Sequence, residues 1–202
     1  MHIKNIKGMI LKIDLEKVFD GTSWIYIWML LTHLGFPIYV INSIICCITS
    51  MSYSVLINGS SSNFFHAERG LRKRCPLSPL VFLLVIEGLS RLLIDEKNNG
   101  RFKGIKIIDN CILSHLLFVD DVLIFLNGSI SDSTVFNYVL KLFCKATSMK
   151  CNHLKSTFSS MGFFQHEIHF SLQQFPFSPI EFEEGFKYLG FRLIPNKYKI
   201  AD

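Results

Sequence analysis

The sequence has no Asp, Glu, Lys or Arg between Asp20 and Glu68. Within this uncharged stretch, residues 36–57 are long enough to cross a bilayer at about 1.5 Å per residue. Pro37 and Asn42 interrupt the apolar run, residues 49–52 are polar, and no basic cluster flanks the stretch closely, as the ends of membrane spans usually require. We therefore expect a buried helix at about 38–49, a strand at about 53–58, and no membrane partner.

The cysteines form no CxxC pair, and residues 1–8 are too short and basic for a secretory signal. The six are Cys46, Cys47, Cys75, Cys111, Cys144 and Cys151. This usage predicts reduced thiols in an intracellular protein, with the nucleus and the cytoplasm both open. Neither the HxxH of His166 and His169 nor the pair Cys151 and His153 has the spacing of a four-ligand zinc site.

The composition is that of one globular unit with a modest basic balance. The 202 residues are 50% hydrophobic, and 21 Lys and Arg against 16 Asp and Glu give a net charge of +5. The densest basic cluster is Arg69, Arg72, Lys73 and Arg74. A cluster of this kind favours either a polyanionic partner or an ordinary solvated loop.

The most informative residues are two adjacent acids, Asp120 and Asp121, between apolar runs at 116–119 and 122–125. Two β-prone runs joined across two acids predict a hairpin with charge at its tip. Adjacent carboxylates repel each other unless a cation compensates them. Asp14, at the end of an apolar strand at about 9–15, is a third acid in a similar setting. Three such acids could hold two Mg²⁺ or Mn²⁺ ions about 3.5–4 Å apart for nucleotidyl transfer.

Several strings resemble, in order and rough spacing, the palm motifs of LINE-type (non-LTR) retrotransposon reverse transcriptases, in a form abundant in plant genomes. These are KIDLEKVFD at 12–20, SYSVLING at 52–59, RGLR at 69–72, PLSP at 76–79, FVDD at 118–121, Lys150, Asn152, Lys155 and Ser156, and KYLG at 187–190. The resemblance covers about residues 9–195. It implies a single partial reverse transcriptase domain within residues 1–202.

The resemblance implies a role for each matching residue. Asp14 and Asp120 would hold both metals, with Asp121 as the supporting acid and the carbonyl of Leu15 completing the shell. Phe19 would exclude a ribose 2′-hydroxyl, against the alternative of an ordinary core aromatic, and Lys155 would protonate the pyrophosphate. The remaining assignments are nucleotide contacts at Lys73 and Arg74, and contacts to template or primer at Arg69, Arg72, Tyr188 and Gly190. The implied substrates are an RNA template, a DNA primer and deoxynucleoside triphosphates.

The sequence also departs from the family. Lys73, Arg74 and Cys75 stand where the family has Gln-Gly-Asp, and Ser148 stands where it has glycine. Glycine gives close backbone approach without a Cβ, and the aspartate would act in a turn and cap. We also expect fingers and thumb to be largely missing. Three alternatives stay open: a truncated polymerase palm that is inactive alone, a non-catalytic nucleic-acid-binding or interaction remnant, and a pseudogene product without function. The oligomeric state is open as well.

The pattern of elements predicts an α+β palm, an antiparallel sheet backed by helices, rather than a doubly wound sheet. We expect helices at about 23–34, 78–95 and 131–147, the last capped from the polar stretch 129–133. Further strands are expected at 105–108, 155–161 and 187–193. Residues 165–184, which contain Pro176 and Pro179, look irregular.

Overall fold

The chain divides into two units, which are described separately. A computed structural model describes residues 7–108, 111–163, 165–181 and 184–193. The sheet unit comprises residues 1–15, 89–142 and 151–202, and the helical unit comprises residues 16–88 and 143–150. The long helices α4 (Leu77–Asn98) and α5 (Ile130–Thr147) contribute residues to both.

The sheet has six strands in the order β12-β11-β1-β9-β8, with β10 also pairing with β1. The strands are β1 (Gly8–Glu16), β8 (His115–Phe118), β9 (Asp121–Leu126), β10 (Lys150–Cys151), β11 (Thr157–Met161) and β12 (Ser178–Pro179). β1 pairs antiparallel with β9 and β11, β8 pairs antiparallel with β9, and β11 pairs parallel with β12. The sheet is therefore predominantly antiparallel, as the sequence predicts.

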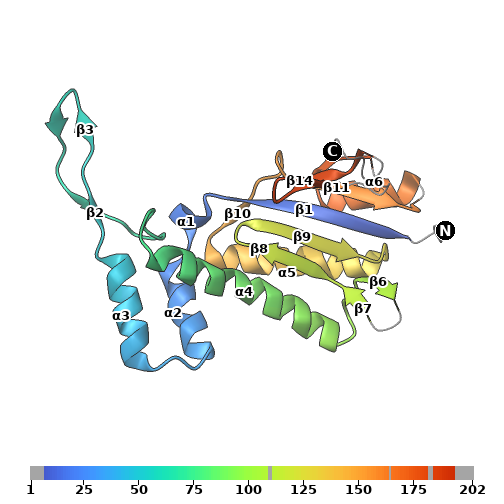
Figure 1. Cartoon of the computed structure of the whole chain (residues 1–202), viewed down its shortest axis with the longest axis horizontal. Helices are drawn as coiled ribbons and strands as arrows, with labels where there is room; N and C mark the ends of the chain where they lie inside the picture. Colours follow the sequence, from blue (N-terminus) through green and yellow to red (C-terminus); the bar gives the residue numbers. More distant parts are fainter. Residues whose placement is uncertain (1–6, 109–110, 164, 182–183, 194–202) are drawn as a thin grey trace. The chain divides into compact units, whose positions relative to one another are not determined.

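One face of β1 carries the core and the other carries charge. Met9, Leu11 and Ile13 are fully buried, whereas Lys12 and Asp14, on the opposite face by strand alternation, are only partly buried. Figure 1 shows α5 running along the sheet, and α5 buries Phe136, Val139 and Leu140, which are spaced as one helical stripe. Helix packing on one face thus leaves Asp14 on the face that stays accessible.

The sheet unit also contains two separate hairpins and a helix. The hairpins are β6 (Ile105–Ile108) with β7 (Cys111–Leu113), and β13 (Phe186–Tyr188) with β14 (Phe191–Leu193). The expectation of an irregular segment at 165–184 is wrong for its first half, because α6 spans Gln165–Gln174. Pro176 and Pro179 follow this helix and do not interrupt it.

The helical unit begins where β1 ends. Lys17 has a φ of 46°, and the chain turns there into α1 (Val18–Gly21). Two longer helices follow, α2 (Trp24–His33), which Ser23 caps by accepting from the Tyr26 amide, and α3 (Ile38–Thr49). The bounds of α3 agree with the prediction. Its expected burial is wrong, because only Ile41 and Ile48 are buried and much of its apolar surface, including Tyr39, is exposed.

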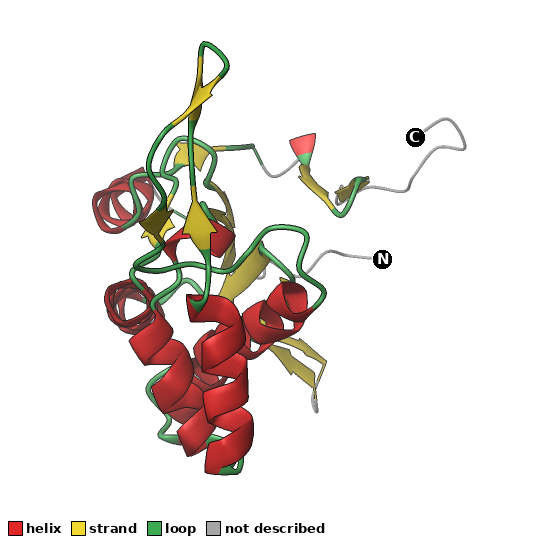
Figure 2. Ribbon diagram, turned by 90° about the vertical axis from the view of Figure 1, so that its left-hand side faces the viewer, coloured by secondary structure: helices red, strands yellow, loops and turns green. Residues whose placement is uncertain are grey.

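A two-stranded arm follows α3 within the helical unit (Figure 2). β2 (Ser52–Tyr53) pairs with β5 (Phe65–His66) at its base, and β3 (Leu56–Ile57) pairs with β4 (Ser60–Ser61) near its tip. The predicted single strand at 53–58 is therefore wrong. Asn58 and Gly59, with φ of 51° and 83°, form a two-residue turn, and Asn-Gly is the pair that this turn type favours.

Helix α4 is long and apolar enough to cross a membrane by length and composition alone. Half of its most apolar window is buried inside the fold, and core helices of soluble proteins meet the same criterion. The only helix in the stretch considered above as a membrane span, residues 36–57, is the 12-residue α3, which is shorter than a bilayer requires.

Candidate active site

The hairpin β8–β9 places the paired acids at one end of the sheet. Phe118 pairs with Asp121, so the two-residue turn consists of Val119 and Asp120, and Asp121 is already the first residue of β9. This shifts the predicted tip by one residue. Val119 has a φ of 55°, a left-handed conformation that is costly for a β-branched side chain. A strained turn therefore presents Asp120.

Strand register brings Asp14 and Asp121 together. Asp14 of β1 lies directly opposite Asp121 of β9, so both side chains project from the same face at the same end of the sheet. Asp120 is exposed in the adjoining turn. In the described part of the chain, no three His, Cys, Asp or Glu side chains form a group that could hold a metal ion. The arrangement is thus an opposed pair of carboxylates with a third acid beside it.

Two residues of the loop between β10 and β11 hold the backbone of Asp14. The Asp14 amide donates to Ser156 Oγ at 3.0 Å, and the Asp14 carbonyl accepts from the Asn152 amide at 2.8 Å. The Asn152 side chain also accepts from the amides of Leu154 and Lys155, which closes the loop on itself. Lys155 is exposed in this loop. The loop therefore positions one predicted site residue and carries another.

Lys12 is a site residue that the sequence analysis did not single out. Its ammonium lies 3.7 Å from Asp121 Oδ1 and donates to the carbonyl of Lys187 at 2.7 Å. Lys12 and Asp14 share a strand face, so the alternation of β1 alone places this cation beside the acids. Lys12 thereby connects the acidic pair to the hairpin β13–β14.

The hairpin β13–β14 turns at Leu189 and Gly190, whose φ values are 51° and 85°. Burial raises the pKa of the Tyr188 phenol, and the negative charge of Asp121 raises it further. Tyr188 therefore lies close enough to Asp121 for the two side chains to interact electrostatically. The predicted hairpin is present, and it brings Tyr188 to the acids within the sheet unit.

The predicted nucleotide contacts lie in the helical unit, apart from Leu15, which is buried at the end of β1. Phe19 is half-buried, and its ring packs on Phe82 with centroids 5.3 Å apart. Lys73 forms an ion pair with Asp20 at 2.8 Å. Arg69, Arg72 and Arg74 are exposed. The chain turns at Lys17, just before Phe19, and the sugar-excluding role of Phe19 stays a prediction.

The residues that depart from the family occupy special backbone positions. Arg74 and Ser148 stand where the family has glycine, and their φ values are 65° and 62°, in the left-handed region that glycine adopts readily. Cys75 stands where the family has aspartate. Hydrogen bonding from the Leu77 amide lowers the pKa of the Cys75 thiol, with smaller contributions from Ser78 and Arg72. Cys75 therefore retains part of a capping role at the start of α4.

The histidines and cysteines do not gather into a metal-binding group in the described part of the chain. His115 forms hydrogen bonds with Ser90 and Ser114 through its two ring nitrogens. In the described structure none of the six cysteines forms a disulfide. The side chains of His166 and His169 lie outside the described residues.

Comparisons with known proteins identify the protein family to which a chain with this sheet and these acids belongs. Residues 2–193 match the family described as "Reverse transcriptase (RNA-dependent DNA polymerase)". The chain therefore belongs to the reverse transcriptase family. The Pol polyprotein of the type-1 retrotransposable element R2 of Popillia japonica is 25% identical over 127 residues, which are 61% of this chain and 20% of that protein. The match to an R2 element confirms the predicted kinship with non-LTR retrotransposons.

An uncharacterised mitochondrial protein of Arabidopsis thaliana is 42% identical over 67 residues, which are 33% of this chain and 55% of that protein. The chain thus spans about half of one curated relative and a fifth of the other.

Solved telomerase structures share the fold. Apo telomerase from Candida tropicalis, truncated from its C-terminal domain, aligns with a TM-score of 0.59 at 11% identity over 79% of this chain and 32% of that chain. Telomerase from Candida albicans, in complex with a fragment of telomeric RNA, aligns with a TM-score of 0.55 at 13% identity over 74% and 27%. These matches confirm the palm-like α+β fold.

Proposed function

We propose that the chain contributes the catalytic palm of an RNA-directed DNA polymerase from a non-LTR retroelement. The observation that carries the proposal is the register of β1 and β9, in which Asp14 opposes Asp121 while Asp120 occupies the adjoining turn. Three acids at one sheet end, in a chain of the reverse transcriptase family, support nucleotidyl transfer. The substrates would be an RNA template, a primer 3′-hydroxyl and deoxynucleoside triphosphates.

The chemistry of these donors suits hard divalent cations, because Mg²⁺ and Mn²⁺ prefer carboxylate and carbonyl oxygens. Among the described residues the three acids are not grouped closely enough to form a metal site by themselves, so metal binding would have to draw them together. Asp14 and Asp120 would hold both ions, with Asp121 and the Leu15 carbonyl in support. When bound, the two ions would lower the pKa of the attacking hydroxyl and neutralise charge on the transferring phosphate. The loop of Asn152 and Ser156 would hold Asp14 in place by fixing its amide and carbonyl.

The remaining residues would position substrates. Lys155, in the loop that holds Asp14, is suited to donate a proton to the leaving pyrophosphate. Tyr188 and Gly190 on the hairpin β13–β14 would contact the primer, with Lys12 tying that hairpin to the acids. Phe19 would exclude a ribose 2′-hydroxyl. Arg69, Arg72, Lys73 and Arg74 would contact phosphates of nucleotide, template or primer.

Mn²⁺ binding measured by electron paramagnetic resonance tests the acidic site. We expect Asp14→Asn and Asp120→Asn each to weaken Mn²⁺ binding by at least tenfold, since each removes a charged ligand. The matched control is Asp95→Asn, an exposed acid on α4. Mg²⁺ should displace Mn²⁺ from the wild-type chain. Equal Mn²⁺ affinity in all three variants would overturn the assignment of these acids as metal ligands.

A second candidate function is a nucleic-acid-binding remnant without catalysis. The ion pair between Lys73 and Asp20 and the left-handed Arg74 favour it, because the segment expected to contact the nucleotide is altered in charge and backbone. A gain of primer extension would favour the first candidate over the second. A variant with Lys73→Gln, Arg74→Gly and Cys75→Asp, which restores the family residues, gains activity only if the acids are competent. Its matched control carries Asp120→Asn in addition.

A further inference from the structure

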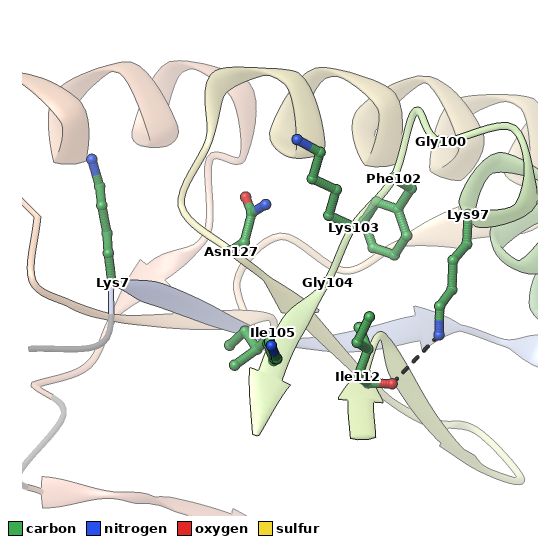
Figure 3. A pocket seen from close by; sticks show the side chains of 10 residues that line it. Lys7, Lys97, Gly100, Phe102, Lys103, Gly104, Ile105, Ile112 and Asn127 are labelled. Atoms are coloured by element: carbon green, nitrogen blue, oxygen red, sulfur yellow. Dashed lines mark hydrogen bonds between the residues drawn. The ribbon is translucent and has the colours of Figure 1, made fainter. Parts of the chain in front are cut away.

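A lysine-lined pocket lies in the sheet unit, at the end of β1 and β9 away from the acids (Figure 3). It has a volume of about 560 Å³. The basic residues that line it are Lys7, Lys97, Lys103 and Lys106. Among the described residues, no Asp or Glu belongs to the lining, whose other members are glycines, Asn127, Phe102, Ile105 and Ile112. The pocket therefore combines positive charge with an apolar floor.

The four lysines come from three separate segments. Lys7 precedes β1, Lys97 lies in the last turn of α4, and Lys103 and Lys106 lie in the loop before β6 and in β6 itself. Together they make this part of the sheet unit positively charged, and a positively charged region attracts an anionic ligand. The fold thus brings Lys7, at the start of β1, to the three lysines that lie between residues 97 and 106.

The loop that carries Lys103 is fixed by a buried acid. Asp132, fully buried at the start of α5, accepts from the amides of Lys103 and Gly104 at 3.0 and 2.9 Å. Gly104 has a φ of 71°, and a Cβ there would lie 2.6 Å from the Leu113 carbonyl oxygen. The nearby Glu96 is bound by Arg101, which lowers the pKa of the Glu96 carboxyl. Hydrogen bonds from the backbone therefore fix the wall of the pocket that carries Lys103, and Asp132 and Glu96 each already have hydrogen-bond partners.

The pocket and the acids share a face of β1. Gly8, Lys12 and Asp14 have the same parity, and a Cβ at Gly8 would lie 2.9 Å from Cδ1 of Ile105, which lines the pocket. Six residues of strand separate Gly8 from Asp14, roughly 20 Å at about 3.3 Å per residue. The pocket is therefore distinct from the acidic site.

We propose that this pocket binds the phosphate backbone of a single-stranded nucleic acid. In Figure 3 the side chains of Lys7, Lys97 and Lys103 point in different directions, and Lys97 donates to the Ile112 carbonyl at 3.5 Å. Ammonium groups that do not converge on one point suit several phosphates along a strand better than one small anion. Lysines act as point charges without the bidentate geometry of arginine, so the contact is sequence-independent. The proposal does not depend on catalysis at Asp14 and Asp120.

Fluorescence anisotropy with a labelled single-stranded 20-nucleotide RNA, without divalent metal, tests the proposal. We expect Lys103→Gln with Lys106→Gln to weaken binding about tenfold and to reduce the slope of log K against log salt by about 1.4. The matched control is Lys141→Gln with Lys145→Gln, which removes the same charge from exposed positions on α5. Equal affinity of the two double variants would overturn the proposal, provided that both unfold at the wild-type temperature.

Two further measurements identify the ligand and the place of contact. Crosslinking of a 4-thiouridine oligonucleotide should map to peptides within residues 97–113, and crosslinks confined to residues 69–74 would contradict the site. Inorganic triphosphate should compete only at concentrations well above those of the oligonucleotide, because it engages fewer lysines. Equal competition would mean a small-anion site instead. Because the binding assay contains no divalent metal, its outcome is independent of metal binding at the acids, which separates this test from that of the acidic site.

Discussion

At the scale of single residues, Arg74 and Ser148 are side chains on backbone that suits glycine. A left-handed conformation costs an L-residue about 1–2 kcal/mol, and glycine avoids this cost. Glycine also makes the unfolded chain more flexible, which favours unfolding by about 0.4–1 kcal/mol and so offsets part of the gain. We predict that Arg74→Gly and Ser148→Gly each raise the free energy of unfolding by about 0.5–1 kcal/mol, measured by urea denaturation. Ala146→Gly, in the last turns of α5, should instead lower it by about 1 kcal/mol. Destabilisation by the first two substitutions would contradict the assigned backbone strain.

Cys75 stands where the family has aspartate and keeps part of the capping role of that aspartate. The Leu77 amide stabilises the thiolate, so the pKa of Cys75 is lower in the folded chain than in the unfolded chain. A depressed pKa contributes stability above the unfolded value, and this contribution is lost as pH falls through the folded value. We predict that alkylation of Cys75, followed by mass spectrometry of its peptide, has a midpoint at lower pH in the native chain than in urea. Coincident midpoints would rule out the capping interaction.

At the scale of elements, the contact between α2 and α4 depends on the absence of a Cβ at Gly88. The Tyr26 hydroxyl points at Gly88, where a Cβ would lie 2.0 Å from the phenolic oxygen, and burial raises the pKa of Tyr26 to about 12. We predict that Gly88→Ala lowers the free energy of unfolding by about 1–3 kcal/mol despite the better helix propensity of alanine.

Tyr26→Phe is the matched rescue, because it removes the oxygen and leaves ring carbon Cζ at 3.3 Å, a close contact that a shift of a few tenths of an ångström relieves. The double variant should recover most of the lost stability, as a double-mutant cycle would report. Additive effects of the two substitutions would show that the hydroxyl is not the obstacle.

The sequence predicted the bounds of helices and strands better than it predicted which of their side chains are buried. Strand β1 and helices α2, α3, α4 and α5 lie within a few residues of their predicted bounds, because alternation, capping residues and prolines act locally. The burial of α3 was predicted wrongly, since an apolar helix does not reveal whether anything covers it. The Asn58-Gly59 turn was a local signal that was overlooked, and α6 was hidden by the prolines that follow it.

The candidate site was predictable in part. The acids are marked by the apolar strands that precede them, and register then brings Asp14 opposite Asp121. The contacts of Ser156 with Asp14 and of Lys12 with Lys187 join residues 142 and 175 positions apart. No local pattern encodes pairings of that range, which follow from the order of strands in the sheet.

At the scale of the whole molecule, the 202-residue polypeptide is predicted not to extend a primed template, even with Mg²⁺ or Mn²⁺. It spans a fifth of the R2 polyprotein and about a third of the aligned telomerase chain. Positioning supplies much of the rate of phosphoryl transfer, so acids without an aligned substrate contribute little. The measurement is primer extension beside Asp120→Asn. Extension by the wild-type chain that this variant lacks would prove the prediction wrong.

The arm of the helical unit has a consequence for handling the protein. Leu56 and Ile57 of β3 are 75% and 62% exposed, and Phe64, just before β5, is 77% exposed. The outer edges of these short strands have no neighbour among the described residues. Apolar side chains beside open strand edges are templates for edge-to-edge pairing. Light scattering of the purified chain should therefore rise steeply with concentration, and the single substitution Leu56→Lys should keep the preparation clear. Colloidal behaviour, rather than folding, would then set the concentration at which this chain can be studied.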